Sequence, residues 1–362
     1  MSPEGFQPPV YPYERLADAK AAAESLPGGV VDLSVGTPCD PPPAAVVEAL
    51  SSSGTERGYP MSVGSARYRE AAAGWMQRRL GVAVDPADVF ACVGTKEFVA
   101  TAPQWLRLRT PARDTVLYPA VSYPTYEMGA TLAGCRAVPY ESLAEISDDD
   151  AGRALCVWVN SPGNPAGQVD DLGAAAAWGR EHGVPVLSDE CYVEFTWAGE
   201  KRSILQHGSE GVVALHSVSK RSNLAGLRAG FYAGDPALVR YLGEVRKHVG
   251  MLVPGPVQAA AAVALDDDAH VDEQRDRYFA RLERFREVLA KLDVFVPLPA
   301  GGFYLWAEVD DAWGFTNRLA ADGGALVSPG EFYGPTGAGH VRVALVQPLE
   351  RLELVAERLG VA

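Results

Sequence analysis

The residues best suited to chemistry lie within residues 217–230, which read SVSKRSNLAGLRAG. Lys220 follows an apolar run, and a lysine amine forms a Schiff base with a carbonyl compound where its charged form is disfavoured. The hydroxyls of Ser217 and Ser219 and the cation of Arg228 are suited to binding a phosphate. An isolated Ser-Lys pair is usually part of a surface loop, so this interpretation depends on the segments that accompany it.

Two further polar segments follow apolar runs. The sequence NSPGNPAG contains Asn164, and its Pro-Gly and Asn-Pro pairs favour a fixed turn. The sequence DECY begins with Asp189, whose carboxylate is able to pair with a protonated ring nitrogen. Ligands of α/β proteins bind at the carboxyl ends of strands, where both segments would lie. Each segment alone is as consistent with a loop turn or a capping aspartate as with a site.

Arg342 stands inside the otherwise apolar run 341–346. Burying an unpaired guanidinium is very costly, so Arg342 requires an anionic partner. That partner is either the carboxylate of a bound substrate or an acidic side chain in a structural salt bridge.

The elements that must position these residues alternate between short apolar runs and helical segments. Strands are predicted at 115–118, 136–140, 155–160, 184–188, 212–217 and 229–233. Helices are predicted at 44–50, 65–80, 96–108, 126–133 and 172–182, with Pro103 kinking or shortening the third. This alternation indicates βαβ units and a mostly parallel sheet. Runs such as LCVWV are apolar almost throughout, which suits strands that are covered on both faces.

The chain changes character on either side of this region. Residues 1–43 are rich in proline and are typical of an arm that crosses the surface, with one short strand at 31–35. After residue 254 the patterns predict helices at 271–292, near 313–321 and at the C-terminus, with strands at 302–309, 325–328 and 341–346. The sequence thus predicts an α/β protein with a large domain, residues 44–255, and a smaller discontinuous α+β domain, residues 1–43 with 256–362.

Composition excludes several classes of protein. The 362 residues are 48% apolar and 22% charged, which excludes wholesale disorder, and no apolar stretch is long enough to span a membrane. A net charge of −14 argues against nucleic acid or an anionic membrane as a partner. No signal peptide is visible, and the five scattered cysteines lack CxxC spacing, so we expect reduced thiols in a cytoplasmic protein. The histidines show no metal-binding spacing, so no metal is expected.

These segments, in this order, resemble those of the fold-type I aminotransferases of class I/II, which use pyridoxal 5′-phosphate (PLP). The resemblance covers NSPGNPAG, DECY and SVSK, with Arg228 eight residues after Lys220, and it extends to both ends of the chain. DLSVGTP, GYP, GTKE, YPTY and HVRVAL also resemble segments of the family. The resemblance implies a large domain with a mainly parallel seven-stranded sheet, a smaller α+β domain, and a homodimer with shared active sites.

The resemblance also implies roles around the cofactor. Lys220 would hold PLP as a Schiff base and then shuttle a proton between the substrate and the cofactor. Asp189 would keep the ring nitrogen protonated, which is the protein's main electronic influence on the cofactor. Asn164 and Tyr192 would donate hydrogen bonds to the O3′ oxygen of the ring, and Tyr123 would stack on the ring face.

The remaining implied roles concern the phosphate and the substrate. The phosphate would lie at the start of a helix, where unpaired amides and the helix dipole favour an anion. The groups that would bind it are Gly94, Thr95, Lys96, Ser217, Ser219 and Arg228, with Tyr59 reaching in from the neighbouring subunit. The α-carboxylate of the amino-acid substrate would be bound by Gly36, Asn164 and Arg342.

Within the family, the segments GTKE, SYPTYEMGA and DLSVGTPCDPPP and the short length are similar to those of actinobacterial N-succinyldiaminopimelate aminotransferases of lysine biosynthesis. The implied reaction moves an amino group between glutamate/2-oxoglutarate and N-succinyl-L,L-2,6-diaminopimelate. Since that substrate carries several carboxylates, we expect further cations in the distal pocket, with Lys96, Arg221 and Arg246 as candidates.

Other reactions stay open because a shared fold does not settle the chemistry. An aspartate or aromatic aminotransferase is the nearest alternative, and a PLP-dependent carbon–sulfur lyase is another. A non-catalytic PLP-binding regulatory module is the alternative from a different class of protein. Such modules follow a basic DNA-binding segment, and the net charge of −14 opposes that assignment.

Overall fold

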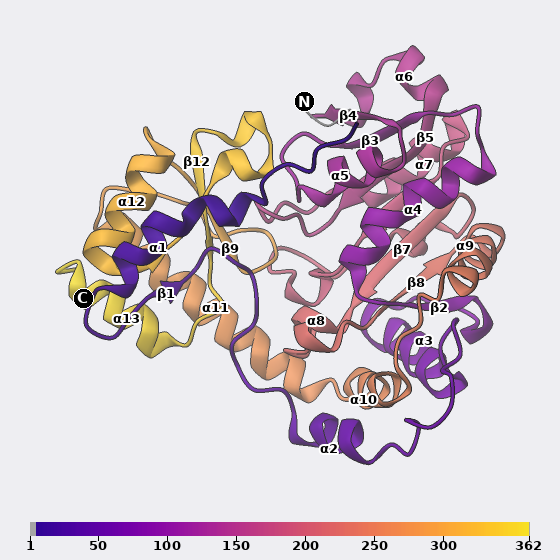
Figure 1. The fold of residues 1–362 in the computed structure, drawn as a ribbon, viewed down its shortest axis with the longest axis horizontal. Helices are drawn as coiled ribbons and strands as arrows, with labels where there is room; N and C mark the ends of the chain where they lie inside the picture. The colour runs from indigo at the N-terminus through magenta and orange to yellow at the C-terminus, as the bar shows by residue number, and fades with distance from the viewer. Residues whose placement is uncertain (1–4, 362) are drawn as a thin grey trace.

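The larger of two lobes is built on a seven-stranded sheet in the order β2-β8-β7-β6-β5-β3-β4 (Figure 1). Along the chain its strands are β2 (Val89–Cys92), β3 (Thr115–Pro119), β4 (Arg136–Tyr140), β5 (Ala154–Asn160), β6 (Val186–Asp189), β7 (Val212–Ser217) and β8 (Gly230–Gly234). The strands from β7 to β4 pair in parallel, whereas β8 is antiparallel to both β7 and β2. This computed structural model describes residues 5–361, and it confirms the predicted α/β fold with a mainly parallel sheet.

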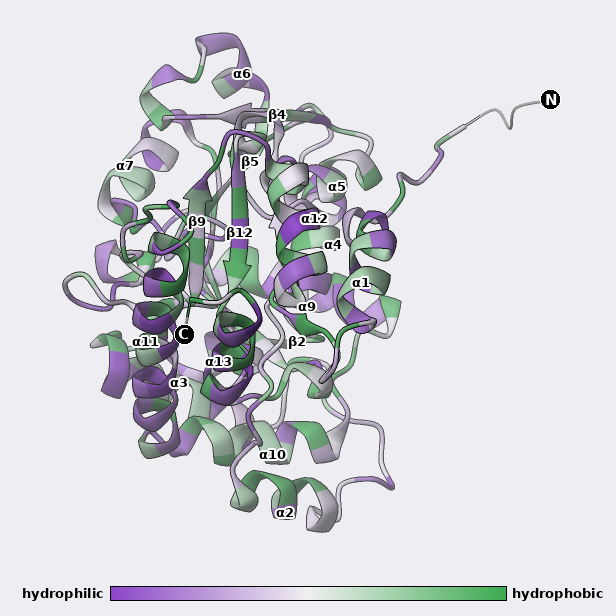
Figure 2. Cartoon of the chain, turned by 90° about the vertical axis from the view of Figure 1, so that its left-hand side faces the viewer, coloured by the Kyte–Doolittle hydropathy of each residue, from purple (hydrophilic) through white to green (hydrophobic). Residues whose placement is uncertain are grey.

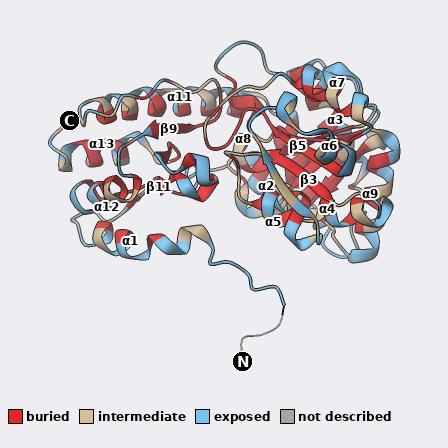
Figure 3. Cartoon of the chain, turned by 90° about the horizontal axis from the view of Figure 1, so that it is seen from above, coloured by how far each residue is buried: buried red, intermediate tan, exposed pale blue. Residues whose placement is uncertain are grey.

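Helices cover both faces of this sheet. They are α2 (Ala44–Ser52), α3 (Ala66–Leu80), α4 (Thr95–Arg109), α5 (Thr125–Leu132), α6 (Asp148–Arg153), α7 (Leu172–His182), α8 (Val218–Arg221), α9 (Pro236–Val249) and α10 (Gly255–Asp266). In β5, Trp158 packs in the core that α4, α5 and α9 share, while its neighbours Val157 and Val159 pack with α7 on the opposite face. Burial on both faces explains why the strands are apolar almost throughout. Figure 3 shows these buried strands inside a shell of helices with exposed outer sides.

Some of these elements differ from the prediction. Strand β2 and helices α6, α8, α9 and α10 were not predicted, nor was α1 (Ala17–Glu24) in the N-terminal arm. Helix α4 runs through Pro103 without being shortened. The acidic residues 148–150 form the first turn of α6, where Ser147 accepts a hydrogen bond from the amide of Asp150 at 3.1 Å. Negative charge is favourable at that end of a helix, which explains why an acidic cluster begins α6.

The smaller lobe combines the N-terminal arm with the last third of the chain. Its elements are η1 (Pro12–Leu16), α1 (Ala17–Glu24), β1 (Val31–Asp32), α11 (Ala269–Ala290), β9 (Tyr304–Glu308), α12 (Ala312–Gly323), β10 (Ala325–Leu326), β11 (Ser328–Pro329), β12 (His340–Ala344) and α13 (Leu349–Arg358). Strands β11, β12 and β9 form an antiparallel sheet, and β1 pairs in parallel with β10. Figure 2 shows the polar outer faces of α11 and α13 against the apolar strands of this lobe.

The packing of α10 bears on where the large domain ends. Buried alanines of α10 share a hydrophobic core with α3, and α11 then crosses to the smaller lobe (Figure 1). We therefore propose that the large domain continues to about residue 266, beyond the predicted end at residue 255. No helix within residues 5–361 is long and apolar enough to cross a membrane.

Candidate active site

A cavity of about 510 Å³ lies at the carboxyl edge of the large sheet and is lined by residues of both lobes. The predicted site residues that line it are Gly36, Thr95, Lys96, Tyr123, Asn164, Asp189, Tyr192, Ser217, Ser219, Lys220, Arg228 and Arg342. Gly94 precedes Thr95 as the N-cap of α4. Tyr59 does not line the cavity, and its side chain is 99% exposed.

Strand direction explains why residues so far apart in sequence meet at one edge. Strands β5, β6 and β7 are parallel neighbours, and they end at Asn160, Asp189 and Ser217. Strand β8 runs the opposite way, and its first residue, Gly230, pairs with both Ser217 and Cys92. The chain therefore enters β8 at the edge where the other strands leave the sheet.

Gly94 and Arg228 are brought together by this reversed strand. The backbone of Gly94 has a φ of 75°, and a Cβ atom there would lie 2.2 Å from the Nη2 atom of Arg228. Glycine is required for both reasons, because other residues rarely adopt this φ and their Cβ would displace the guanidinium. The start of α4 and the cation of Arg228 consequently face the same end of the cavity.

Lys220 projects into the cavity from α8, a single turn that Ser217 caps by accepting a hydrogen bond from the amide of Ser219 at 3.0 Å. Its Nζ atom donates a hydrogen bond to the carbonyl of Gly36, and no carboxylate within residues 5–361 forms an ion pair with it. Burial lowers the pKa of Lys220 to about 8, an effect that Cys191 opposes and that Arg342 and Arg228 reinforce. Lys220 is thus an amine that loses its proton readily.

Asp189 lies at the end of β6 with no cationic partner within the described part of the chain. Burial raises the pKa of Asp189, while hydrogen bonds from the Cys191 amide at 3.2 Å and from the Tyr126 hydroxyl at 3.1 Å favour its ionised form. The Nδ2 atom of Asn160 donates to the backbone oxygen of Asp189 at 2.8 Å, and its Oδ1 atom accepts from the Asn164 amide at 2.8 Å. These two bonds tie the NSPGNPAG turn to the DECY segment.

Arg342 is 1% exposed, and no carboxylate within residues 5–361 lies within ion-pair distance of its guanidinium. It donates hydrogen bonds to Asn164 Oδ1 at 2.8 Å, to the Tyr13 hydroxyl at 3.2 Å and to the carbonyl of Ser34. Its Nε atom has no hydrogen-bond partner, and the Tyr304 ring centroid lies 4.3 Å from its guanidinium carbon. The alternative of a structural salt bridge is therefore wrong for these residues, and the guanidinium keeps its capacity to bind an anion.

The cavity is lined by more tyrosines than the sequence interpretation named. Besides the predicted Tyr123 and Tyr192, the lining includes Tyr11, Tyr13, Tyr126 and Tyr304. The YPTY segment contains Tyr126, so its second tyrosine was a signal that could have been used. Tyr11 and Tyr13 lie in the proline-rich arm, where no periodic pattern marks them as site residues.

Two of the three cations suggested for the distal pocket do not reach the cavity. Arg246 forms two hydrogen bonds of 2.6 Å with the carboxylate of Glu97, and Arg221 is buried on the opposite side of α8. Lys96 does line the cavity, and its Nζ atom donates to the Tyr11 hydroxyl at 3.2 Å. Of these three candidates, Lys96 is therefore the one that lines the cavity.

The family is decided by comparison with known proteins. A model of the family described as aminotransferase class I and II matches residues 28–359. The chain belongs to this family. Members of the family use PLP, so this class I/II aminotransferase is a PLP-dependent enzyme.

Similar proteins cover nearly the whole chain of this aminotransferase. The 4-dedimethylamino-4-oxo-anhydrotetracycline transaminase OxyQ of Streptomyces rimosus is 43% identical over 97% of this chain and 99% of its own. The probable aminotransferase Rv1178 of Mycobacterium tuberculosis is 44% identical over 97% of this chain and 85% of its own. The solved structure of the probable N-succinyldiaminopimelate aminotransferase of Thermus thermophilus is 32% identical with a TM-score of 0.85, covering 97% of this chain and 100% of that one.

The cavity of this aminotransferase fits PLP by its charges. The Lys220 amine with its lowered pKa suits the aldehyde of the cofactor, and the unpaired Asp189 carboxylate suits the ring nitrogen. The start of α4 beside Arg228 suits the phosphate. These three groups form no ion pair within residues 5–361, and they correspond to three functional parts of one cofactor.

Proposed function

We propose that this aminotransferase moves an amino group between glutamate/2-oxoglutarate and N-succinyl-L,L-2,6-diaminopimelate. The observation that carries the proposal is the pair of cations on one cavity lining, Arg342 and Lys96. Arg342 has no carboxylate partner and suits an α-carboxylate, while Lys96 suits a second, distal carboxylate. The name of the Thermus thermophilus relative supports this substrate class, as does an LL-diaminopimelate aminotransferase of Aquifex aeolicus that is 35% identical over 91% of this chain and 90% of its own.

Lys220 and Asp189 carry the central roles in this proposal. When bound, PLP supplies an electron sink for the bond that breaks at the substrate's α-carbon. Lys220 holds the cofactor and moves the proton at that carbon, a task for which a pKa of about 8 suits the amine. Asp189 keeps the ring nitrogen protonated. The side chain of Asn164 presents Oδ1 to Arg342, which leaves its Nδ2 group to donate a hydrogen bond to the ring oxygen.

The other contacts proposed here hold and orient the cofactor. Tyr192, whose hydroxyl lies 2.9 Å from that of Tyr304, donates to the ring oxygen, and Tyr123 stacks on the ring. The phosphate is bound at the start of α4, after Gly94, by the backbone amides of Thr95 and Lys96, and by Ser217, Ser219 and Arg228. The substrate α-carboxylate is bound by Gly36, Asn164 and Arg342.

A homodimer in the cytoplasm is also part of the proposal. Tyr59 is 99% exposed in the single chain, which suits a residue that completes the phosphate site of a second subunit. All five cysteines are free thiols in the structure, which suits a reducing compartment. Light scattering should give twice the 38.5 kDa mass of one chain, and Tyr59→Phe should weaken PLP binding about tenfold by removing one hydrogen bond to a charged group. A monomer that binds PLP normally would contradict this arrangement.

The substrate is tested with a panel of amino donors and 2-oxoglutarate on the PLP-loaded enzyme. Succinyldiaminopimelate should be the preferred donor, and Lys96→Ala should raise its KM about tenfold while changing that of alanine little, because alanine has no distal carboxylate. Activity with aspartate or aromatic donors alone would reject the proposed substrate. Release of pyruvate and ammonia from a cysteine conjugate, with no keto-acid acceptor, would indicate a lyase.

A second candidate follows from the Streptomyces rimosus relative. Its name describes a transaminase for a 4-oxo-anhydrotetracycline, and this chain is 43% identical to it. The six tyrosines of the cavity lining supply aromatic surface against which a fused-ring ketone could pack. The same assay with that ketone as amino acceptor decides between the two, since turnover of the ketone without turnover of succinyldiaminopimelate would favour the second candidate.

A further inference from the structure

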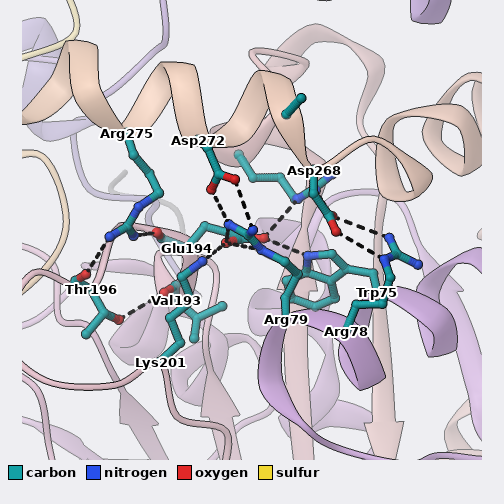
Figure 4. Close-up of polar contacts among 12 residues, drawn as sticks. Trp75, Arg78, Arg79, Val193, Glu194, Thr196, Lys201, Asp268, Asp272 and Arg275 are labelled. Carbon is teal, nitrogen blue, oxygen red and sulfur yellow. Dashed lines mark hydrogen bonds and ion pairs between the residues drawn. The ribbon is translucent and has the colours of Figure 1, made fainter.

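Behind the cavity, one buried carboxylate is surrounded by cations (Figure 4). Glu194 lies on η4 (Val193–Phe195), just after the DECY segment, and its side chain is 3% exposed. Arg79, Lys201 and Arg221 each form an ion pair with it. We call these four residues the Glu194 cluster.

The contacts within the Glu194 cluster come from separate parts of the chain, and that of Arg221 is an ion pair without a hydrogen bond. Lys201 Nζ lies 2.6 Å and Arg79 Nη2 lies 3.0 Å from Oε2 of Glu194, and Trp75 donates to Oε1 at 2.7 Å. Arg221 Nε lies 3.6 Å from Oε1. Although burial acts to raise it, the three cations lower the pKa of Glu194 to about 2, so Glu194 is ionised at any working pH.

Arg221 connects this cluster with the lysine of the cavity. It is the last residue of α8, whose four residues are too few to form a stable helix on their own. Its side chain is 2% exposed, donates to the carbonyl of Ala264 at 2.6 Å and lies 5.6 Å from the ring centroid of Trp75. Lys220, the preceding residue, lines the cavity instead, so Arg221 anchors from behind the turn that presents the amine.

Glu194 is also held in place by contacts of its backbone. It follows Tyr192 by two residues, and Arg275 of α11 donates to the carbonyls of Glu194 and Thr196. A single buried ion pair thus joins the segment that follows Asp189 and Tyr192 to the turn that carries Lys220. We propose that Glu194 and Arg221 are positioning residues, whose ion pair orients the Lys220 amine relative to Asp189 and Tyr192 for proton transfer.

Arg79 provides the matched control for this proposal. It contacts the same carboxylate through Nε at 3.2 Å and Nη2 at 3.0 Å, and it also binds Asp272 at 2.6 Å. Arg79 belongs to α3, which does not carry Lys220. If the cluster served only to stabilise the fold, loss of Arg79 would matter at least as much as loss of Arg221.

The experiment compares Arg221→Gln with Arg79→Gln in the PLP-loaded enzyme. We expect Arg221→Gln to lower kcat about tenfold or more, because small displacements of a reacting group are costly, with KM changed by less than about threefold. It should also alter the visible circular dichroism of the bound cofactor at unchanged PLP content. Arg79→Gln should lower Tm by at least as much yet keep kcat within about twofold and leave the dichroism unchanged.

Two further variants complete the test. Glu194→Gln should reproduce the changes in kcat and dichroism of Arg221→Gln, and the double variant should change them little further, because both substitutions break the ion pair between Glu194 and Arg221. Arg221→Lys retains the cation and should lower kcat by only about threefold, and it replaces Arg221→Gln if that variant does not fold. The proposal is overturned if the Arg79 and Arg221 variants change kcat and dichroism alike, or if neither changes them.

The dichroism separates this inference from the proposed function on which it rests. The signal requires no substrate, so it is informative even if succinyldiaminopimelate is not used. If Lys220 did not hold the cofactor, Lys220→Ala would keep the cofactor's absorbance band, and the proposed role of Lys220 would fail before the role of Arg221 is examined.

Discussion

The cofactor cavity and the Glu194 cluster are both enclosed and rich in charge, but they match their charges differently. In the cluster, Glu194 pairs with three cations of the same chain, and two of these cations also pair with Asp272 and Asp268. In the cavity, Lys220, Asp189 and Arg342 form no ion pair with any residue from 5 to 361. A buried charge without a charged partner costs stability. Such charges in the cavity therefore indicate a ligand site, whereas charges that are paired within the chain indicate a structural role.

The largest effect expected from this comparison is that of Lys220→Ala. The variant should lose at least about 10⁴-fold in kcat/KM, because the nucleophile and the proton carrier are removed together. It should also lose the absorbance of the lysine-bound cofactor while its Tm stays near that of the wild type. Lys247→Ala is the control, since Lys247 is an exposed lysine whose ion pair within residues 5–361 is with Glu244. A yellow, active Lys220→Ala enzyme would contradict the assignment.

Glu194→Ala should produce the largest loss of stability. It leaves three cations without their shared carboxylate, and breaking a buried ion pair in this way costs about 3–5 kcal/mol in the free energy of unfolding. Urea denaturation measures this cost. Glu353→Ala breaks an exposed pair with Arg284 and should cost no more than about 1 kcal/mol. Equal losses in the two variants would show that burial of the cluster does not set its strength.

Arg342→Gln should lower activity more than stability, which is the opposite of what is expected for Glu194→Ala. The value of kcat/KM for the amino donor should fall about 100-fold, because the substrate carboxylate loses its cation in a buried site. The free energy of unfolding should fall by less than in Glu194→Ala, because Arg342 loses hydrogen bonds to neutral acceptors and no carboxylate within residues 5–361 loses its partner. Steady-state kinetics and urea denaturation of the same preparation test both statements. A loss of stability as large as that of Glu194→Ala would mean that Arg342 is a scaffold residue.

The smallest effect concerns the pH dependence of stability in the enzyme without cofactor. The pKa of Lys220 is about 8 in the folded chain and 10.5 without the fold, so the unfolded chain binds more protons between these values and stability rises with pH there. The pKa of Glu194 is about 2 against 4.5, so its contribution is complete above pH 4.5 and is lost as pH falls toward 2.

These two pH slopes are measured as differences between the wild type and a variant. Subtracting the unfolding free energy of Lys220→Met should reveal a rise of about 1 kcal/mol between pH 8 and 10.5, reduced from the full shift because the lysine is partly exposed. Subtracting the unfolding free energy of Glu194→Gln should reveal the loss of stability as pH falls from 4.5 toward 2. A flat difference for Lys220→Met across the alkaline range would contradict the lowered pKa.

Much of the cavity could be predicted because its residues follow strands directly. Asn160, Asp189 and Ser217 end three parallel neighbours, and apolar runs mark those strands clearly. Strand β2, whose four residues are all buried, was not predicted. Tyr13 was also missed, because it reaches Arg342 from a proline-rich segment without periodicity.

The Glu194 cluster could not be predicted because its contacts join residues far apart in sequence. The Arg/Glu pattern of α11 suggests a solvated helix face, and Arg277 does pair with Glu273 at 3.4 Å on that face. Arg281 instead binds Asp40 at 2.7 Å, and Arg275 binds the carbonyl of Glu194. Local spacing cannot distinguish these arginines, since tertiary packing alone decides which of them meets water and which meets a distant acceptor.

The short pairing of β1 with β10 ties an early segment of the chain to a late one. Val31 pairs with Ala325, and Arg351 binds the carbonyls of Gly28 and Val30. A ribosome adds about 5–20 residues per second, so Val31 waits on the order of tens of seconds for its partner. The strands of the large sheet all leave the ribosome before Ala325, so the segment around Gly36, although made early, is held by this pairing only late. The lobe that carries the proposed cofactor residues is therefore synthesised before Arg342 joins Gly36 on the substrate side of the cavity.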